Sequence, residues 1–342
     1  MNAMVLTNVR RLEMRELPEP DEVQAGELRL KVKSVGICGS DVHYYSKGRI
    51  GSVPVEYPHI MGHEFSGVVE EAGSDVAGFE IGELVAVDPA ISCGECAQCL
   101  AGRPNTCATI CFLSCPGEAD GCLAETVVVP AANCFRTALS PEEAALAEPL
   151  SIGVYAAQRV AQQLPSANIA IQGAGPIGLG VLAASRSLGA TRRYVSDPLA
   201  YRREAAGRLE AEWTGAPEAL DALVDNDMQG LFDIVIECCG QQDALDQAMR
   251  ILKPGGCLLI VGIPEGQRTS FSTDLMRRKE ITIRNVRRQI DCMQPALELL
   301  ANGSSAYSSL VTHRYAFDET PAAFETVAQY RDGVIKAMVE IA

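Results

Sequence analysis

The chain has 342 residues, enough for about two domains. Hydrophobic residues make up 47% of it and charged residues 21%, which is ordinary for a globular protein and argues against a disordered or fibrous chain. Its 29 basic residues and 44 acidic residues give a formal net charge of −15. Because this charge repels a phosphate backbone, we expect no nucleic-acid partner.

The N-terminal segment and the cysteine content indicate where the chain resides. The first residues, MNAMVLTNVRRLEMRE, lack an apolar run of signal-peptide length. The long uncharged segment at 169–185 is too interrupted by glycine and proline for a membrane-spanning helix. We therefore expect a cytoplasmic protein with no membrane partner and with its 13 cysteines reduced. Their crowding between Cys93 and Cys134 indicates metal binding.

The predicted elements change character along the chain. Short apolar runs broken by turn residues predict an all-β segment over the first 90 residues, with strands at 28–35, 67–71 and 84–87. From Pro141 helical patterns alternate with aliphatic runs, which predicts βαβ units and a parallel sheet with strands at 169–172, 194–196, 234–237 and 258–261. The last segment returns to the first pattern, with a helix at 295–302 and strands at 310–311 and 337–341.

Four cysteines follow one another closely in CGECAQCLAGRPNTC, namely Cys93, Cys96, Cys99 and Cys107. Four thiolates at these short separations suit a closed tetrahedral zinc site, which leaves no position for a substrate. We therefore predict a structural zinc. Iron–sulfur ligation, disulfides and unbound buried thiols are the alternatives that the spacing leaves open.

Three separate fragments carry further metal-ligand types: Cys38 in GICGSDVHYY, His63 and Glu64 in GHEFSG, and Glu148 in AEPLSIG. A cysteine, a histidine and a carboxylate gathered at one place would give three protein ligands and an open position, which is typical of catalytic zinc. The spacing does not show that the fragments meet. Each fragment is also compatible with a structural role.

A glycine-rich turn follows the aliphatic run at 168–172, in NIAIQGAGPIG. The first glycine of G-x-G-x-x-G permits a tight turn, the second lets a pyrophosphate approach the backbone, and the third lets the next helix pack on the strand. The helical pattern continues over 179–188, and its N-terminus favours a phosphate. The segment therefore predicts a dinucleotide site at Gly173, Gly175, Pro176, Ile177 and Gly178.

Asp197 ends the next aliphatic run, about 20 residues after the first glycine, where an acid that accepts from the adenosine ribose is expected. A carboxylate there repels a 2′-phosphate, so the sequence favours NAD over NADP. Arg202, which we also assign to the cofactor site, and Arg203 keep NADP open as the lesser alternative. A helix N-cap ahead of Pro198 is the structural alternative for Asp197.

Taken together, the chain resembles the medium-chain zinc-dependent dehydrogenases, and within them the polyol branch of the sorbitol (L-iditol) dehydrogenases. The resemblance is carried along nearly the whole chain by GICGSDVHYY, GRIG, GHEFSGVV, the four-cysteine segment, EPLSIG, GAGPIG and LVTHR. It implies an α/β protein with a GroES-like β-rich catalytic domain and an inserted Rossmann domain with a doubly wound parallel sheet. The implied limits are 1–150 and 289–342 for the first, with its zinc lobe at about 90–110, and 151–288 for the second.

The resemblance also implies the roles of individual residues. Catalytic zinc would be held by Cys38 and His63 with a carboxylate from Glu64 or Glu148, both of which count as catalytic, and relatives differ in which acid binds directly. With the four-cysteine site this makes two zinc ions per chain. A proton relay would run through Ser40 and the nicotinamide ribose to His43. The residues near the substrate or cofactor pocket in relatives are Tyr44, Phe112 and Arg288, although the segment around Arg288 aligns ambiguously.

The implied activity is oxidation of a secondary alcohol of a polyol to a ketone, with hydride transfer to NAD. The resemblance also implies a homo-oligomer, either a dimer or a tetramer. The same chemistry on L-threonine, on a sugar acid such as L-idonate or on a small diol is the nearest alternative. A non-catalytic protein that binds zinc and a nucleotide is the alternative from another class.

Overall fold

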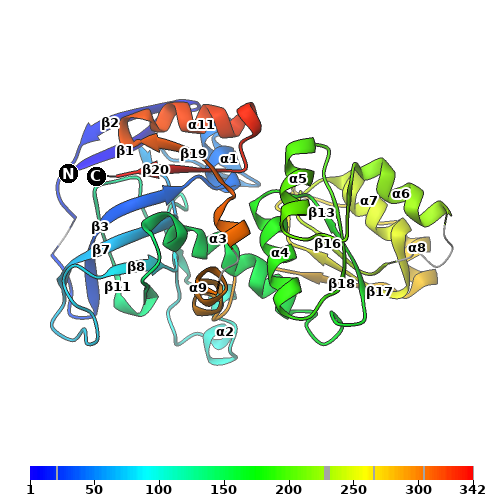
Figure 1. Cartoon of the computed structure of the whole chain (residues 1–342). Coiled ribbons are helices and arrows are strands. Elements are labelled where there is room, and N and C mark those ends of the chain that lie inside the picture. The colour runs from blue at the N-terminus through cyan, green and yellow to red at the C-terminus, as the bar shows by residue number, and fades with distance from the viewer. Residues whose placement is uncertain (21, 227–231, 265, 303–304, 342) are drawn as a thin grey trace. The chain divides into compact units, whose positions relative to one another are not determined.

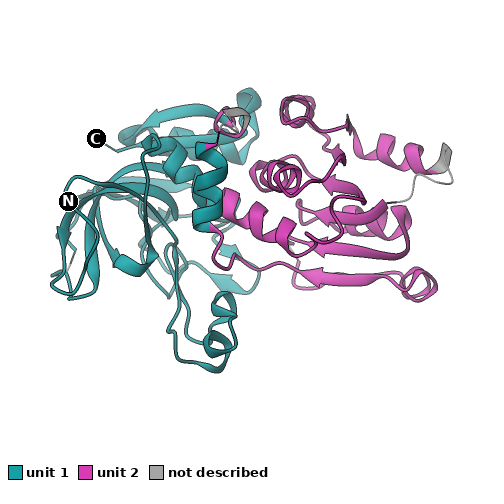
Figure 2. Ribbon diagram, turned by 60° about the horizontal axis from the view of Figure 1, so that its bottom comes forward, with its two compact units in different colours: residues 1–148, 293–301, 311–342 teal, residues 149–292, 302–310 magenta. Residues whose placement is uncertain are grey.

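The computed structural model describes residues 1–20, 22–226, 232–264, 266–302 and 305–341. These form two compact units, of which the first comprises 1–148, 293–301 and 311–342 and the second 149–292 and 302–310 (Figure 2). Helix α3 (Pro141–Gln158) carries the chain from the first unit into the second. The domain limits drawn from the sequence at 150 and 288 stay a prediction.

The first unit consists mainly of β-strands (Figure 1). Its strands are β1 (Asn2–Asn8), β2 (Arg11–Glu16), β3 (Glu27–Gly36), β4 (Arg49–Ile50), β5 (Val53–Pro54), β6 (His59–Ile60), β7 (Glu64–Ala72), β8 (Leu84–Val87), β9 (Ala90–Ile91), β10 (Cys111–Phe112), β11 (Thr126–Pro130), β12 (Cys134–Arg136), β19 (Val311–Ala316) and β20 (Lys336–Glu340). The main sheet has the order β12-β8-β7-β3-β20-β19, and β11 also pairs with β3. The last two strands of the chain, β19 and β20, are thereby joined to β3 and β7 in one sheet, whereas β1 and β2 form a separate sheet with β6.

The alternation of side chains along β3 shows which face of this strand is buried. Leu28, Leu30 and Val32 are buried, and the residues between them are half-buried. Because successive side chains of a strand point to opposite faces, this pattern places one apolar face in the core. That core includes Phe65, on the neighbouring strand β7, and Phe324.

Helix α1 (Gly39–Lys47) corrects the prediction of an all-β first segment. It begins after Cys38, whose extended backbone (φ −86°, ψ 151°) forms the N-cap, and ends at Gly48 in the left-handed region at φ 65°. The apolar runs that predicted strands on either side do not reveal this nine-residue insertion, about two and a half helical turns, between them. The other helices of the first unit are α2 (Ala97–Leu100), α9 (Met293–Ala301) and α11 (Thr320–Ala328).

The second unit confirms the predicted parallel sheet. Its six strands have the order β15-β14-β13-β16-β17-β18, every pair is parallel, and helices lie on both faces (Figure 1). The strands are β13 (Asn168–Gln172), β14 (Arg192–Ser196), β15 (Trp213–Gly215), β16 (Phe232–Glu237), β17 (Leu252–Ile260) and β18 (Thr282–Asn285). The helices are α4 (Pro176–Ser187), α5 (Ala200–Arg208), α6 (Pro217–Asn226), α7 (Gln242–Ile251), α8 (Thr273–Lys279) and α10 (Ser305–Ser308). The strand order reverses between β13 and β16, which is where doubly wound sheets bind ligands.

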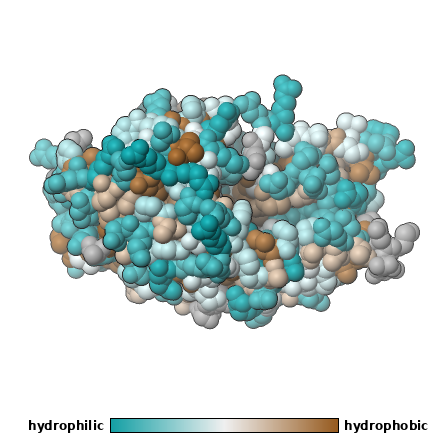
Figure 3. All heavy atoms as spheres, turned by 90° about the horizontal axis from the view of Figure 1, so that it is seen from above, coloured by the Kyte–Doolittle hydropathy of each residue, from teal (hydrophilic) through white to brown (hydrophobic). Residues whose placement is uncertain are grey.

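The surface is mostly hydrophilic on the face drawn in Figure 3, where hydrophobic residues occupy separate small areas. Exposed large apolar side chains such as Ile81 and Leu100 lie far apart in the sequence. Single residues of this kind are normal on a protein surface. Within the described ranges, no helix combines the length and the apolar content that crossing a membrane requires.

Candidate functional site

Strand register brings three of the predicted ligands together. β3 pairs antiparallel with β7, and Gly36 at the end of β3 lies opposite Glu64 at the start of β7. Cys38 follows β3 by two residues, and His63 precedes β7, so both come to the same end of this strand pair. One ligand atom from each of Cys38, His63 and Glu64 lies within 4.8 Å of the others.

Glu148 reaches the same region from helix α3 but is outside that three-residue group. Its side chain is buried at 7% exposure. Burial raises the pKa of Glu148 to about 8, an effect that His63 opposes and Glu64 reinforces through their charges. Of the two carboxylates that the sequence left open as ligands, the structure groups Glu64 with the cysteine and histidine.

Asp41 supports His63 from the first turn of α1. Its side chain is fully buried, and its Oδ2 lies 3.4 Å from His63 Nδ1. Ser114 Oγ donates to Asp41 Oδ1 at 2.7 Å and accepts from the Gly62 amide at 3.1 Å. Although burial alone would raise the pKa of Asp41, the interactions with His63, Ser114 and the Gly62 amide lower it. The sequence analysis missed Asp41, and its place three residues after Cys38 was the available signal.

A second missed residue is Lys336, the first residue of β20. Its side chain is 2% exposed, and its ammonium donates to Glu64 Oε2 at 2.5 Å and to the Ile37 carbonyl at 3.1 Å. The available signal was a single charged residue inside the apolar segment VIKAMV. A buried lysine is rare without a partner, and here the partner is a candidate metal ligand.

Four other predicted site residues, Ser40, His43, Tyr44 and Phe112, belong to the same unit as these ligands, and Arg288 does not. Ser40 and His43 stand three residues apart on α1, both half-buried, so they occupy one face of the helix. The Phe112 ring centroid is 5.2 Å from that of His63. Tyr44 is buried, and its ring meets His59 edge to face. Arg288 belongs to the second unit, where its backbone adopts φ 51°.

The four cysteines of the lobe come together as the sequence predicted. Their sulfur atoms are separated by 3.4 Å (Cys93 to Cys107), 3.6 Å (Cys96 to Cys99) and 3.9 Å (Cys93 to Cys99 and Cys96 to Cys107). A regular tetrahedron with zinc–sulfur bonds of about 2.3 Å has edges of about 3.8 Å. The observed spacing therefore fits a closed zinc site.

Backbone amides around the lobe favour thiolates. The Cys93 amide donates to Cys107 Sγ, and the Cys96 amide donates to Cys93 Sγ, each at 3.4 Å. Backbone hydrogen bonds lower the pKa of Cys93 and lower that of Cys96 to about 6. Burial raises the pKa of Cys99 to about 12, and hydrogen bonds with the sulfur atoms of Cys96, Cys107 and Cys93 add to this shift. A divalent metal would favour the thiolate form of all four cysteines.

The glycine turn has the geometry that the dinucleotide motif requires. Gly173 adopts φ 95°, and Gly175 forms the N-cap of α4 ahead of Pro176. A Cβ on Gly178 would lie 1.9 Å from the Gly173 carbonyl oxygen, so only glycine fits there. Among the described residues, an added Cβ on Gly175 would meet Arg202 Nη1 alone within 4 Å, at 3.6 Å.

Asp197 connects the end of β14 to this turn. Its side chain is 3% exposed, with Oδ2 accepting from the Ala174 amide and Oδ1 from the Leu199 amide, both at 2.8 Å. Arg202 Nη1 is 3.8 Å from Asp197 Oδ2. The N-cap of α5 is Leu199, so Asp197 precedes the helix without capping it. The carboxylate and the guanidinium thus stand together beside the glycine turn.

Glu237 at the end of β16 is a further buried group that the sequence analysis missed. Its Oε1 accepts from the amides of Cys239 and Gly240. A Cβ on Gly173 would lie 3.2 Å from Cys239 Cβ, so this turn packs against the glycine turn. Glu237 therefore fixes the loop that adjoins the dinucleotide site.

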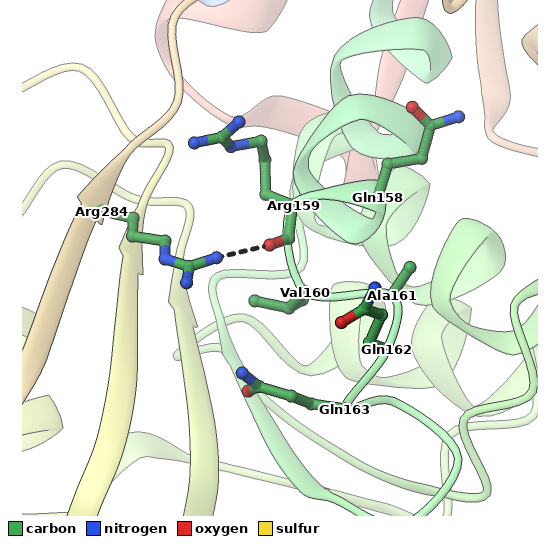
Figure 4. A pocket seen from close by; sticks show the side chains of 7 residues that line it. All are labelled: Gln158, Arg159, Val160, Ala161, Gln162, Gln163 and Arg284. Carbon is green, nitrogen blue, oxygen red and sulfur yellow. Dashed lines mark hydrogen bonds between the residues drawn. The ribbon is translucent and has the colours of Figure 1, made fainter.

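A pocket of about 250 Å³ in the second unit does not belong to either set of chemical groups (Figure 4). Arg284 donates to the Arg159 carbonyl at 2.7 Å at its edge. No cysteine, histidine or carboxylate lines this pocket, which is formed by Gln158, Arg159, Val160, Ala161, Gln162, Gln163 and Arg284.

Comparison with known proteins shows the family of the chain. The family model described as alcohol dehydrogenase GroES-like domain matches residues 24–139, and that of zinc-binding dehydrogenase matches 176–302. The chain is 38% identical to a sorbitol dehydrogenase of Bacillus subtilis, over 99% of this chain and 97% of that one. It is 33% identical to an L-arabinitol 4-dehydrogenase of Aspergillus oryzae, over 95% and 89% of the two chains. An alcohol dehydrogenase of Escherichia coli, solved with NADH, matches with a TM-score of 0.88 at 28% identity over 99% of both chains.

The first unit is GroES-like and contains a candidate metal site with a cysteine, and the second contains a Rossmann-like parallel sheet. Together these features are those of the medium-chain dehydrogenases. The chain belongs to the zinc-binding alcohol dehydrogenase family, enzymes that act on CH–OH donors. The family and fold predicted from the sequence are confirmed.

Proposed function

We propose that this chain oxidises a secondary hydroxyl of a polyol to a ketone and transfers the hydride to NAD. The observation that carries the proposal is the grouping of Cys38, His63 and Glu64, which offers one sulfur, one nitrogen and one oxygen ligand. Three protein ligands leave a fourth position for a substrate oxygen, which is the arrangement of catalytic zinc sites.

The residues present fit zinc. A thiolate, an imidazole and a carboxylate are its usual ligands, and Asp41 next to His63 is the kind of carboxylate that orients a zinc-bound histidine. Zinc in this site supplies a Lewis acid that polarises the substrate hydroxyl. Cys38, His63 and Glu64 would hold it, with Glu148 buried nearby as the second carboxylate.

The hydroxyl proton needs a route of its own, because only the hydride goes to the cofactor. Ser40 and His43 are the residues proposed for this route, through the nicotinamide ribose. Their position on one face of α1, after the ligand Cys38, supports the assignment. Tyr44, Phe112 and Arg288 are proposed to contact the substrate or cofactor, and the contact of Phe112 with His63 supports its role.

The cofactor site is proposed at Gly173, Gly175, Pro176, Ile177 and Gly178, with Asp197 and Arg202. Each oxygen of Asp197 accepts one backbone amide and keeps a lone pair for a ribose hydroxyl. Its charge beside the glycine turn repels a 2′-phosphate and so favours NAD over NADP. Arg202 is proposed to contact the same ribose, and its separation of 3.8 Å from Asp197 Oδ2 supports this role.

The substrate class is inferred from the relatives. Two curated dehydrogenases that resemble the chain over nearly its full length act, by name, on the sugar alcohols sorbitol and arabinitol. We further propose a second, structural zinc at the four cysteines, domain limits at 150 and 288, a cytoplasmic location and a homo-oligomer of two or four chains.

The test combines metal analysis with a substrate panel. Purified protein should contain two zinc ions per chain and reduce NAD with sorbitol, xylitol or L-iditol, measured by the absorbance of NADH. L-Threonine, L-idonate and 2,3-butanediol form the comparison set. Turnover of threonine alone would contradict the polyol assignment, and one zinc with no turnover of any alcohol would indicate a non-catalytic binding protein.

A further inference from the structure

Lys336 and Glu64 form a buried ion pair that joins two strands from opposite ends of the chain. The ammonium donates to Glu64 Oε2 at 2.5 Å and to the Ile37 carbonyl at 3.1 Å. Both side chains are almost fully shielded from solvent. An ion pair in this environment loses its hydration on both sides, so removal of one partner leaves an uncompensated buried charge.

A glycine makes this contact possible. β3 lies between β7 and β20, with Gly36 opposite Glu64 on one side and Met338 on the other. A Cβ on Gly36 would lie 2.4 Å from Glu64 Oε2. The carboxylate therefore occupies the space above Gly36 and crosses toward β20, where Lys336 receives it.

The charges around the pair explain why a lysine is needed. The lysine side chain ends in an ammonium group, and the charges of Glu64, Cys38 and Glu148 all act on it. These three groups carry negative charge when they bind a metal. The Lys336 ammonium donates to the Glu64 carboxylate through one oxygen of the latter, Oε2.

We propose that Lys336 is a positioning residue that retains Oε2 of Glu64, so that Glu64 presents its other oxygen to the metal held with Cys38 and His63. The inference rests on the proposed function, because it takes these three residues as the catalytic ligands. It assigns to the last strand a role in the metal site and explains the absence of a side chain at Gly36.

The first test removes the charge of Lys336 while nearly keeping the length of its side chain. Lys336→Met should release the catalytic zinc to a colorimetric chelator about tenfold to 100-fold faster than the unmodified enzyme, as expected when a group that orients a metal ligand is lost. The zinc of the four cysteines serves as an internal control and should leave at an unchanged rate. Lys336→Arg should restore slow release, and Lys253→Met, which removes a partly exposed lysine paired with Asp233, is the matched control.

The second test displaces the carboxylate without changing any charge. Gly36→Ala should accelerate zinc release in the same way, because the new Cβ occupies the place of Glu64 Oε2. Gly67→Ala is the matched control: Gly67 lies on β7, where a Cβ would meet Leu30 and Lys31 at 3.0 to 3.1 Å. Cobalt in place of zinc adds a spectroscopic readout, since the visible bands of the catalytic site should change in Lys336→Met and Gly36→Ala.

A double-mutant cycle separates positioning from general stability. If Lys336 acts through Glu64, Glu64→Gln combined with Lys336→Met should release zinc no faster than Glu64→Gln alone. Should Lys336→Met fail to fold, the double variant, which removes both buried charges, and Gly36→Ala still test the inference. Zinc release at the rate of the unmodified enzyme in both Lys336→Met and Gly36→Ala would overturn it. A wild-type chain with only one zinc would instead refute the proposed function.

Discussion

The Asp41 carboxylate lies 3.4 Å from Nδ1 of His63, and no part of it reaches solvent. The contact depends on helix α1, which directly follows Cys38 and places Asp41 in its first turn. A carboxylate at one ring nitrogen fixes the tautomer of the histidine and leaves the other nitrogen for a metal. The short helix therefore positions two parts of the candidate site: Cys38, a proposed ligand, at its N-cap, and Asp41 beside His63, a second proposed ligand.

Asp41→Asn tests this relationship, because it keeps the shape of the side chain and removes its charge. We expect the affinity of the catalytic site for zinc to fall by about tenfold to 100-fold, with a parallel loss of activity at limiting zinc. Competition with a chelator of known affinity gives the measurement. Asp243→Asn, at an exposed acid in the first turn of α7, is the control, and equal zinc affinity in both variants would contradict the role of Asp41.

Cys107→Ser should remove the zinc of the four-cysteine lobe and leave the catalytic zinc. The metal content should fall from two ions to one per chain, and the thermal midpoint should decrease, because a structural zinc contributes directly to folding. Elemental analysis and calorimetry provide the two measurements. Cys111→Ser, which removes a thiol close by in the sequence, should retain both ions. Loss of activity in Cys107→Ser with both ions still bound would be incompatible with this assignment.

Local sequence was sufficient to predict the lobe and the glycine turn. The four cysteines lie within one short segment, so any compact loop brings their sulfur atoms together. The G-x-G-x-x-G turn is likewise determined by neighbouring residues, and the structure explains its third glycine through the 1.9 Å approach of a Cβ on Gly178 to the Gly173 carbonyl. In both cases, residues that are close in the sequence are also close in the structure.

The grouping of Cys38, His63 and Glu64 could not be predicted from local sequence. Cys38, His63 and Glu64 meet because Gly36 pairs with Glu64 across β3 and β7, and strand register is a property of the whole sheet. Lys336 enters from β20, nearly 300 residues after Cys38 in the sequence, by pairing with β3. The resemblance to a family supplied Cys38 and His63 and left the carboxylate open between Glu64 and Glu148, whereas the ion pair became visible only with the strand order.

Asp197→Asn tests the cofactor assignment. The change keeps the size of the side chain but removes the charge that repels a 2′-phosphate, and it weakens the hydrogen bonds to the ribose. We expect kcat/KM with NAD to fall about tenfold or more, as for loss of a hydrogen bond to a charged group, and the preference for NAD over NADP to narrow. Glu204→Gln, at an exposed acid of α5, should leave kcat/KM with NAD and the preference for NAD over NADP unchanged. An unaltered ratio of the two cofactors in Asp197→Asn would show that another residue selects NAD.

His43→Gln tests the proposed proton route. Loss of a group that transfers a proton in the rate-determining step lowers kcat by about 100-fold or more. We expect His43→Gln to lower kcat by about 100-fold, because water can replace the relay in part. Zinc content should remain at two ions, since His43 is outside the ligand group. Added imidazole buffer should restore part of kcat in the variant and have no effect on the unmodified enzyme. If kcat falls without any response to buffer, His43 contributes to the structure of α1 and not to proton transfer.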